Sequence, residues 1–378
     1  MRPRLMRVLA VATSSAAALG LLLVAESGLR SFGARPGASA ADGFTRAHRH
    51  SESLGWVPRA DFAYAERGVS YTLNAAGHRG AAYGPERRPG VGRVVLLGDS
   101  LTYGYGVGDD QTFAHLVDAA RADVEVVNLG VQGYGLDQSL IMLEERGVAY
   151  RPDVVVLAVC TGNDFLDDVS PVFLYDGRHP KPFYGVDGER LVRHDAHLRR
   201  SAPARLARLL REHSVLVERL AGLGAGGARA PAAEMLGRHI RLPSGESVTL
   251  RDALAVPARR QRAFWRDVSD VSFRLIAEIG RVAAAHGGAY HVLFFPSDPS
   301  HFTPGSWYEA QLADARARPD LRGVSLVDMG AALARRGVSA ETFGRYYLDT
   351  HCHLTPAGHR LAAEELGALI RGVGRDSH

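Results

Sequence analysis

The order of apolar runs along this chain predicts an α/β protein built on a five-stranded, parallel, doubly wound sheet. Short apolar runs typical of buried strands alternate with longer segments of helical periodicity, and this alternation is the pattern of a parallel sheet covered by helices. The predicted strands are residues 94–97, 124–127, 154–159, 290–295 and 324–329, and the predicted helices are residues 112–121, 136–147, 262–286, 306–316 and 357–371.

The last of these helices has the clearest start signal. Thr355 is a residue type preferred at the N-cap, and Pro356 fits the first turn of a helix. Ala362, Leu366 and Ile370 then fall on one face, as expected of a helix that packs on a core.

The chain of 378 residues predicts one main domain with additions. We expect a signal anchor and tether over residues 1–41, a strand-and-turn extension packed on the main sheet over 42–90, and the main domain over 91–378. Residues 169–260 interrupt the alternation of strands and helices. This insertion is predicted to contain one or two helices near the leucines at 206–220 and a glycine-rich segment at 222–233. Either it acts as a lid over the site, or it is an inert peripheral subdomain.

The N-terminal segment predicts the compartment. Three arginines precede Val8–Ala25, a run of eighteen residues without charge, and this pattern is typical of a signal peptide or of a single membrane anchor. We expect an uncleaved anchor, because Ala38-Ser39-Ala40, which resembles a cleavage site, lies far beyond the run. The basic residues predict an N-terminus inside the cell and a main domain outside the cytoplasm, attached to the membrane through this segment. No cysteine follows the run, which excludes a lipoprotein.

The charge distribution excludes a nucleic-acid-binding protein. The chain carries 45 Lys+Arg against 41 Asp+Glu, a net charge of +4, and Lys181 is its only lysine. The arginines are scattered and form no basic stripe interleaved with aromatic residues. The glycines that begin at Gly104 do not match a dinucleotide-binding motif. The residues around Ser100 do not match the nucleophile motif of α/β-hydrolases.

The residues that carry chemistry begin with Gly98-Asp99-Ser100-Leu101, directly after the first predicted strand. A serine at the carboxyl end of such a strand lies where open α/β sheets bind ligands. To act as a nucleophile it needs a base for its proton and donors for an oxyanion. Three later segments contain such groups. They are the glycine-rich turn after strand 124–127, Gly162-Asn163-Asp164 after strand 154–159, and Leu348–Gly358 near the C-terminus.

These four motifs, in this order, resemble those of the SGNH (GDSL) hydrolases, a superfamily of esterases, lipases, carbohydrate deacetylases and some O-acyltransferases. The resemblance implies Ser100 as the nucleophile, and Ser100, Gly133 and Asn163 as the oxyanion hole, with Gly130 as a rival for Gly133 in the same turn. It also implies a three-layer α/β/α, flavodoxin-like fold with its site at the carboxyl ends of the strands. This chemistry requires no metal or organic cofactor.

The resemblance implies His353 as the base, but the acid is displaced. The family places its acid three residues before the histidine, whereas Asp349 is four residues before His353. Asp349 reaches His353 across a longer turn, or His351 is the base, or the site is a Ser–His dyad oriented by a backbone carbonyl. A zinc site is not predicted, since the spacing of His351, Cys352 and His353 is not that of a known zinc motif.

Several residues near these motifs have two possible roles. Ser100 would be the N-cap of the next helix if it were not a nucleophile. Tyr103, Tyr105 and Tyr134 either stack on a sugar or pack in the core. The aspartates at 164, 167 and 168 are expected to form a polar loop, and His359 to be a packing or solvated residue.

The two cysteines, Cys160 and Cys352, flank two of the site motifs. We expect two buried free thiols, with a disulfide as the alternative in an oxidising compartment.

The sequence therefore predicts a serine esterase that cleaves an acyl ester, acetyl or another short chain, of a small molecule or a glycan. One alternative is an O-acyltransferase that modifies an extracytoplasmic glycan. A second is a non-catalytic carbohydrate-binding module with the same fold. The alcohol of the substrate and the oligomeric state are not predicted.

Overall fold

A computed structural model of the chain describes residues 20–32, 43–174, 179–199, 214–216, 239–241, 247–249 and 261–374. The chain divides into two compact units. The smaller combines Met1–Arg46 with Arg199–Ala230, and the larger combines Ala47–Leu198 with Pro231–His378.

In the smaller unit, residues 20–31 are helical and Glu26 binds a second segment. Its carboxylate accepts hydrogen bonds from the Ser214 hydroxyl at 2.9 Å and from the backbone N–H groups of Val215 at 3.1 Å and Leu216 at 2.9 Å. Among the described residues, no helix has the length and apolar character needed to cross a membrane. Residues 8–19 of the predicted anchor lie outside the described part, so the anchor stays a prediction.

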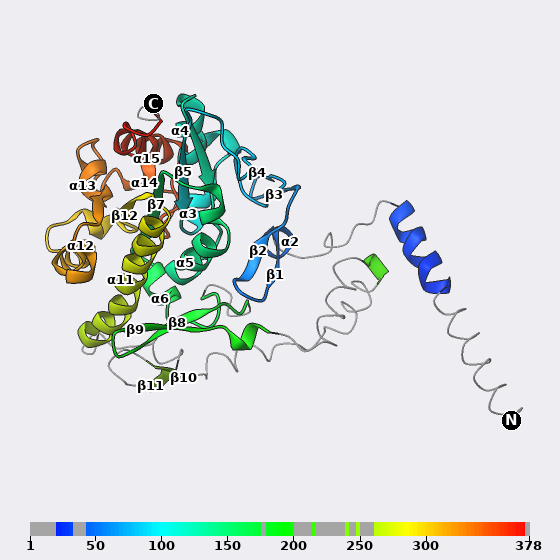
Figure 1. Cartoon of the computed structure of the whole chain (residues 1–378), viewed down its shortest axis with the longest axis horizontal. Coiled ribbons are helices and arrows are strands. Elements are labelled where there is room, and N and C mark those ends of the chain that lie inside the picture. Colours follow the sequence, from blue (N-terminus) through cyan, green and yellow to red (C-terminus); the bar gives the residue numbers. More distant parts are fainter. Residues whose placement is uncertain are drawn as a thin grey trace, which may run out of the picture. The chain divides into compact units, whose positions relative to one another are not determined.

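The larger unit is built on a five-stranded sheet in the order β13-β12-β7-β5-β6, and every pairing in it is parallel. In chain order, counted from the β6 edge, the strands run second, first, third, fourth and fifth, which confirms the predicted flavodoxin-like order. Figure 1 labels three of these strands, β5, β7 and β12. The strands are β5 (Gly92–Leu97), β6 (Val124–Asn128), β7 (Val154–Cys160), β12 (Ala289–Phe295) and β13 (Ser325–Asp328).

Burial explains why these strands are continuous apolar runs. Every residue of β5, β6 and β7 is buried, because helices cover both faces of the sheet. The residues of β13, at one edge, are only partly buried. The order of the sheet reverses between β5 and β7, which both pair at the middle of the sheet, and such a switch point is where open α/β sheets form their sites.

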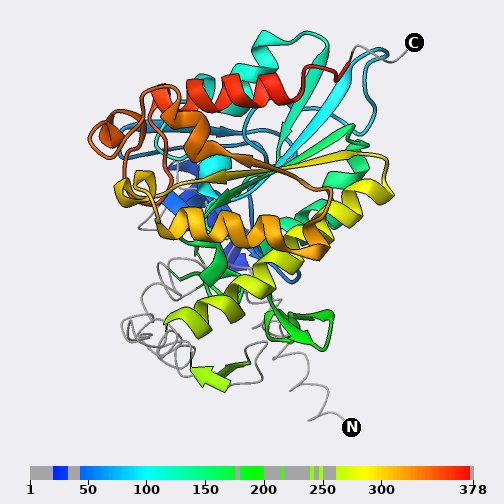
Figure 2. The ribbon, with the colours of Figure 1, turned by 90° about the vertical axis from the view of Figure 1, so that its left-hand side faces the viewer.

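Helices form a layer on each side of the sheet. Helices α4 and α15 pack against each other on one side and α5 and α11 on the other, and Figure 2 shows α15 in red and α11 in yellow-green on opposite sides. The longer helices are α4 (Phe113–Ala120), α5 (Leu136–Glu145), α11 (Gln261–Ala285), α12 (Trp307–Ala317), α13 (Met329–Ala334) and α15 (Pro356–Leu369). The predicted cap of α15 is confirmed, since the Thr355 side chain accepts a hydrogen bond from the Gly358 N–H.

Short elements complete the described chain. The short helices are α2 (Gly43–Ala47), α3 (Ser100–Tyr103), α6 (Asp164–Asp167) and α14 (Phe343–Tyr346). The 3₁₀ helices are η1 (Asp109–Gln111), η2 (Gly147–Tyr150), η3 (Ala196–Leu198), η4 (Pro299–Phe302) and η5 (Pro319–Leu321).

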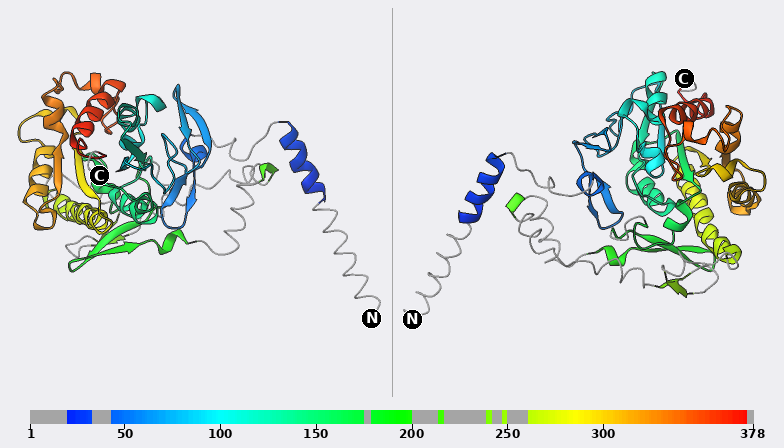
Figure 3. Two further views of the ribbon diagram at one scale, coloured as in Figure 1. Left: turned by 45° about the horizontal axis from the view of Figure 1, so that its top comes forward. Right: turned by 180° about the vertical axis from the view of Figure 1, so that it is seen from behind.

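The segment before the main sheet forms hairpins of its own, drawn in blue in Figure 3. The pairs are β1 (His48–Ser51) with β2 (Gly55–Pro58), and β3 (Phe62–Glu66) with β4 (Val69–Leu73). Each is a separate antiparallel sheet, where a single strand and turn on the main sheet was expected. Arg67 and Gly68 join β3 to β4 and both have positive φ, as the tight hairpin turn requires. Tyr64 of β3 reaches the hydroxyl of Tyr103 in α3 at 2.8 Å, so this hairpin supports the turn that carries Ser100.

The insertion contains two further hairpins. They are β8 (Phe183–Asp187) with β9 (Arg190–His194), and β10 (His239–Arg241) with β11 (Ser247–Thr249). The β8–β9 hairpin was not predicted. Most of the leucines that predicted helices at 206–220, and the glycine-rich segment at 222–233, lie outside the described residues.

Candidate active site

Ser100 follows β5 as the first residue of α3. The turn before it requires glycine, because Gly98 has φ +146° and a Cβ there would lie 2.9 Å from the Ala158 carbonyl oxygen. Asp99, not Ser100, caps the helix, since its Oδ1 accepts a hydrogen bond from the Leu101 N–H at 2.9 Å. The capping reading of Ser100 is therefore wrong, and its hydroxyl is available for another role.

The hydroxyl of Ser100 lies at one end of a chain of two hydrogen bonds. Its Oγ lies 2.9 Å from Nε2 of His353, and Nδ1 of His353 lies 2.6 Å from Oδ2 of Asp349. With Nδ1 protonated and donating to the carboxylate, Nε2 is left as the acceptor for the Ser100 proton. The structure thus brings together the three residues predicted as nucleophile, base and acid.

His351 takes a different position. Its side chain is 48% exposed, and its Nδ1 lies 3.9 Å from Oδ1 of Asp349, beyond hydrogen-bonding distance. The side chain of His353, by contrast, is only 14% exposed. The arrangement favours His353 over His351 as the base.

The loop that carries His353 explains the longer spacing to its acid. Tyr347 and Leu354 pair across its base as an isolated antiparallel bridge, and the Leu348 N–H donates to the His353 carbonyl at 2.7 Å. Between these points Cys352 takes a left-handed conformation with φ +61°. This turn brings Asp349 beside the imidazole although four residues separate them.

Asp349 is ionised in this setting. Partial burial raises the pKa of its carboxyl, but the hydrogen bond from His353 and the charge of that imidazole lower it further, so the pKa lies below its usual value. The His351 N–H adds a hydrogen bond to Oδ1 at 2.9 Å. An ionised carboxylate on Nδ1 stabilises the imidazolium that forms when Nε2 takes a proton.

The glycine-rich turn after β6 distinguishes its two candidate glycines. The Gly130 N–H donates to the Asn128 side chain at 3.0 Å, and a Cβ at 130 would lie 2.6 Å from the backbone nitrogen of Tyr103, so this glycine serves packing. Gly133 has φ +75°, a conformation that favours glycine. Within the described part of the chain its N–H makes no hydrogen bond, so it is available to an oxyanion.

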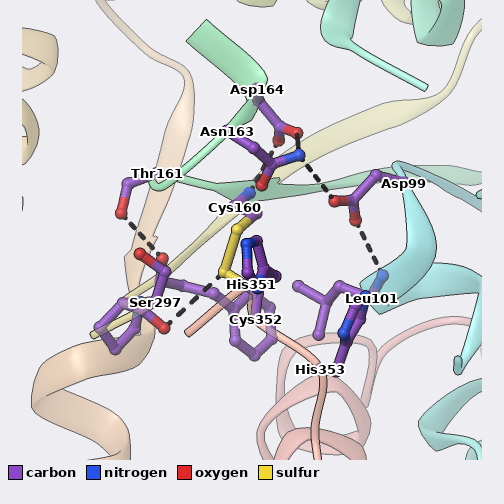
Figure 4. The surroundings of a disulfide bond; sticks show 12 residues. Asp99, Leu101, Cys160, Thr161, Asn163, Asp164, Ser297, His351, Cys352 and His353 are labelled. Atoms are coloured by element: carbon purple, nitrogen blue, oxygen red, sulfur yellow. Dashed lines mark hydrogen bonds between the residues drawn. A yellow bond between two sulfur atoms is a disulfide. The ribbon is translucent and has the colours of Figure 1, made fainter. Parts of the chain in front are cut away.

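Asn163 follows β7 and is buried among carboxylates (Figure 4). Its Nδ2 lies 3.3 Å from Asp99 Oδ2, 3.2 Å from Asp164 Oδ1 and 3.3 Å from Asp167 Oδ2. Its Oδ1 is buried and has no hydrogen-bond partner among the described residues. In this arrangement the amide hydrogens are directed to the carboxylates, so the role of Asn163 as an oxyanion donor stays a prediction.

The aspartates after Asn163 are buried, so the expectation of a polar loop is wrong. Asp164 and Asp167 lie in α6, Asp168 follows it, and each is at most 1% exposed. Each carboxylate has at least one internal hydrogen-bond partner, which is how a buried carboxylate is tolerated, but Oδ1 of Asp167 has none among the described residues. Asp164 accepts from the Cys160 N–H at 2.8 Å, and Asp168 accepts from the Ser272 hydroxyl at 2.6 Å.

Burial raises the pKa of every carboxyl in this group. The pKa of Asp167 rises to about 7, against the partly compensating charge of Lys181. The pKa values of Asp164 and Asp168 rise well above the usual range because of burial and of neighbouring carboxylates. Together with Asp99 and Asp137, these five aspartates of the described chain are called the buried carboxylate cluster below.

Lys181 is the cation of this cluster and was not singled out from the sequence as a functional or structural residue. Its side chain is fully buried, forms an ion pair with Asp137 and donates to the Asp167 carbonyl at 2.6 Å. The available signal was compositional, because Lys181 is the single lysine among the many arginines of the chain. Its place between α5 and the segment after α6 ties the start of the insertion to the main domain.

The tyrosines near the motifs divide into two kinds. Tyr103 and Tyr134 are each 1% exposed, so they pack in the core and cannot stack on a sugar. Tyr105 is partly exposed, and its ring centroid lies 4.7 Å from that of His353. His359 is a buried packing residue whose Nδ1 accepts from the Phe113 N–H at 3.2 Å.

The two cysteines form a disulfide, which corrects the expectation of free thiols. The loop between Tyr347 and Leu354, which carries His353, is called the catalytic loop below. Cys160 ends β7 and Cys352 lies in the catalytic loop, and their Cα atoms are 6.0 Å apart, a separation typical of disulfides. Figure 4 shows the bond between Asn163 on one side and the two histidines on the other. From the sequence the disulfide was only the alternative, because 192 residues separate the two cysteines. Among the described residues, no group of three or more His, Cys, Asp or Glu side chains is arranged to hold a metal ion.

The chain has matches among solved structures but not among protein-family models or curated proteins. Among solved structures, 48 chains match. One is a lipolytic protein of the G-D-S-L family from Veillonella parvula, with 11% identity over 74% of this chain and 98% of that one, at a TM-score of 0.39. The five-stranded parallel sheet with a helical layer on each side is by itself a three-layer α/β/α fold.

Two further matches are acetylxylan esterases. One, a catalytic mutant from Geobacillus stearothermophilus, is 12% identical over 76% of this chain and 95% of its own, with a TM-score of 0.39. The other is 12% identical over 74% of this chain and 99% of its own, with a TM-score of 0.38. At these identities and TM-scores the matches carry no argument, so the fold and the activity of this chain are argued from its own residues.

Proposed function

We propose that this protein is a serine ester hydrolase that forms an acyl-enzyme on Ser100. The observation that carries the proposal is the hydrogen-bonded chain from Ser100 through His353 to Asp349. The three side chains come from the turn after β5 and from a loop near the C-terminus, 253 residues apart for the Ser100–His353 pair. A serine, an imidazole and an ionised carboxylate in this order constitute the machinery of acyl transfer.

In the proposed mechanism each proton transfer has a donor and an acceptor among these residues. As Ser100 Oγ attacks the ester carbonyl, Nε2 of His353 accepts its proton, and Asp349 stabilises the resulting imidazolium. The tetrahedral intermediate collapses when Nε2 returns that proton to the leaving alcohol, which leaves the acyl group on Ser100. Water then repeats the sequence with His353 as its base, releases the acid and restores the serine.

Two backbone donors are available to the oxyanion. They are the N–H groups of Ser100, at the first position of α3, and of Gly133, neither of which is bonded within the described chain. Asn163 would add a third donor by turning one amide hydrogen away from the carboxylates that now accept it. Removing one such donor typically lowers kcat by about 10²–10³-fold.

We propose a short acyl group, acetyl in the first instance. The ring of Phe173 lies next to Gly133, 2.5 Å from where a Cβ at that position would be. We propose that this ring borders the acyl group and limits its length. The Phe173→Ala variant should therefore accept longer acyl groups than the native protein.

We also propose that the main domain works outside the cytoplasm, attached to the membrane through its N-terminal segment. The apolar run Val8–Ala25 with its basic flank supports this. The Cys160–Cys352 disulfide supports it independently, because disulfides persist in oxidising compartments.

Hydrolysis of 4-nitrophenyl acetate by the full-length protein tests the proposal. Native protein should turn over the ester, and Ser100→Ala should not. Ser297→Ala is the matched control, because Ser297 is a buried serine beside Gly162 that bonds to no member of the triad within the described chain.

The test also separates the alternatives. Acetyl transfer to an added sugar that exceeds hydrolysis would indicate an acyltransferase. Absence of turnover in the native protein, with and without an acceptor, would overturn the proposal and favour a binding module.

A further inference from the structure

The Cys160–Cys352 disulfide joins the end of β7 to the catalytic loop, two parts of the site that are 192 residues apart in the chain. Cys352 directly precedes His353 in the catalytic loop, and Cys160 ends β7 three residues before Asn163. Both cysteines are fully buried. Figure 4 shows the bond among residues of both parts, with Asn163 after Cys160, and His351 and His353 on either side of Cys352 in the chain.

Bonds within the catalytic loop fix the acid and the base relative to each other. The imidazole of His353 bonds Asp349, the His351 N–H bonds the same carboxylate, and the Leu348 N–H bonds the His353 carbonyl. All of these bonds begin and end on the loop. They hold the Asp349–His353 pair together but do not determine its distance from Ser100.

The position of the loop relative to Ser100 depends on contacts with the sheet. Here the disulfide links the loop covalently to β7, and β7 is hydrogen-bonded to β5, the strand that Ser100 follows. Leu157 of β7 lies opposite Leu97 of β5, three residues before Ser100. The loop is thereby fixed to the strand next to the one that carries the nucleophile. The partly exposed ring of Tyr105 also lies against the imidazole of His353.

We propose that the Cys160–Cys352 disulfide is a positioning element of the active site. It holds Nε2 of His353 at bonding distance from Ser100, so that the oxidised protein is active and the reduced protein is folded but impaired. The proposal rests on the proposed esterase function. The cysteines touch neither substrate nor reacting atoms and act through His353.

The redox step is an ordinary thiol–disulfide exchange. A dithiol such as dithiothreitol donates two electrons and two protons, the Cys160–Cys352 bond breaks to give two thiols, and the reagent becomes a cyclic disulfide. Oxidised glutathione reverses the change. The buried position of the bond requires that the protein be unfolded in urea and refolded in the presence of the reductant.

The experiment compares kcat and KM for 4-nitrophenyl acetate in four forms of the full-length protein. These are native protein refolded with oxidised glutathione, native protein refolded with dithiothreitol, and the variants Cys160→Ser and Cys160→Ser/Cys352→Ser. Thiol titration gives the redox state, and circular dichroism the folded state. We expect kcat to fall by about 10²-fold without the disulfide, as a displacement of about 1 Å in a catalytic group would cause, while KM changes little. Glutathione should restore kcat in the native protein and not in the double variant.

A variant that is destabilised elsewhere separates positioning from stability. Ile279 is fully buried in α11, so Ile279→Ala should lower the melting temperature and leave kcat unchanged. If folded, disulfide-free protein retains the native kcat, the proposal is overturned. If every disulfide-free form is unfolded, it is also overturned, because the bond then stabilises the whole fold. Absence of turnover in the oxidised native protein would instead contradict the esterase function itself.

Discussion

Asp349 and the buried carboxylate cluster lie close to one site, but their pKa values shift in opposite directions. Asp349 is partly exposed on the catalytic loop, and its partner His353 lowers the pKa of its carboxyl. In the buried carboxylate cluster around Asn163, loss of water raises the pKa of each carboxyl, and Lys181 is the cation in contact with it. The residue type is the same, so solvent and partner decide whether a carboxylate is charged.

This difference in pKa predicts different roles for Asp349 and for the buried carboxylate cluster. A carboxylate that stabilises a developing imidazolium must be ionised at neutral pH, and Asp349 meets this requirement. Carboxyls with a raised pKa instead bond backbone and side-chain groups between β7, α5 and α11. They hold the turn that carries Asn163. The comparison predicts that changes at the catalytic loop affect turnover, and that changes in the cluster affect stability.

The largest expected effect is that of His353→Ala. Loss of the base should lower kcat on the order of 10⁶-fold, as in other serine triads. His351→Ala is the matched control, since that imidazole is largely exposed and should leave kcat nearly unchanged. Steady-state hydrolysis of 4-nitrophenyl acetate measures both. A large loss in His351→Ala with activity retained in His353→Ala would reverse the assignment of the base.

The next largest is that of Asp349→Asn. An amide in place of the carboxylate removes the charge and favours the wrong tautomer of His353, which typically lowers kcat on the order of 10⁴-fold. The unfolding free energy should change little, because the side chain is 38% exposed. If kcat were unaffected, the site would be a Ser–His dyad, with the carboxylate serving only the loop.

In the cluster, Lys181→Met should destabilise the fold. Removing the lysine leaves Asp137 buried without its partner, which typically costs about 3–5 kcal/mol. Urea unfolding followed by circular dichroism measures it, and the exposed Arg322→Met should change stability by less than about 0.5 kcal/mol. A Lys181→Met protein with native stability and greatly reduced kcat would contradict the division between the two groups.

The last effect, at most similar in size to that of Lys181→Met, is the pH dependence that comes from Asp167. Its pKa rises from 3.8 to about 7 on folding, so its contribution to stability is fully present below pH 3.8 and is lost as the pH rises toward 7. Asp167→Asn stays neutral and avoids this loss. Relative to the native protein, the variant should gain as much as ~4 kcal/mol of stability between pH 4 and pH 7. Parallel pH dependences in the two proteins would show that Asp167 is ionised at low pH in the folded state.

The main sheet was predictable from the sequence because its strands are buried on both faces. Continuous apolar runs such as Val154–Val159 have few other interpretations, and the predicted boundaries differ from β7 and β5 by one or two residues. The hairpins were harder, since their strands are short and half-exposed. The β8–β9 hairpin carried one signal, Asp187-Gly188 at its turn, where Gly188 has φ +60°.

The candidate site was predictable where motifs follow strand ends and was not predictable where its parts meet in space. Ser100 was placed at the end of β5 from the sequence, but neither the spacing of Asp349 nor the choice between Gly130 and Gly133 could be resolved without a three-dimensional turn. The disulfide and the buried carboxylate cluster depend on contacts between distant segments. No local pattern shows that Asp168 will lose its water or that Cys352 will face β7.

The central claim, that His353 activates Ser100 as a nucleophile, is tested most directly by labelling with a fluorophosphonate. This reagent phosphonylates an activated serine, and intact-mass and peptide mass spectrometry locate the adduct. We expect one adduct per chain, on Ser100, absent in Ser100→Ala and formed far more slowly in His353→Ala. An adduct on another residue, or equal labelling of the native and His353→Ala proteins, would contradict it.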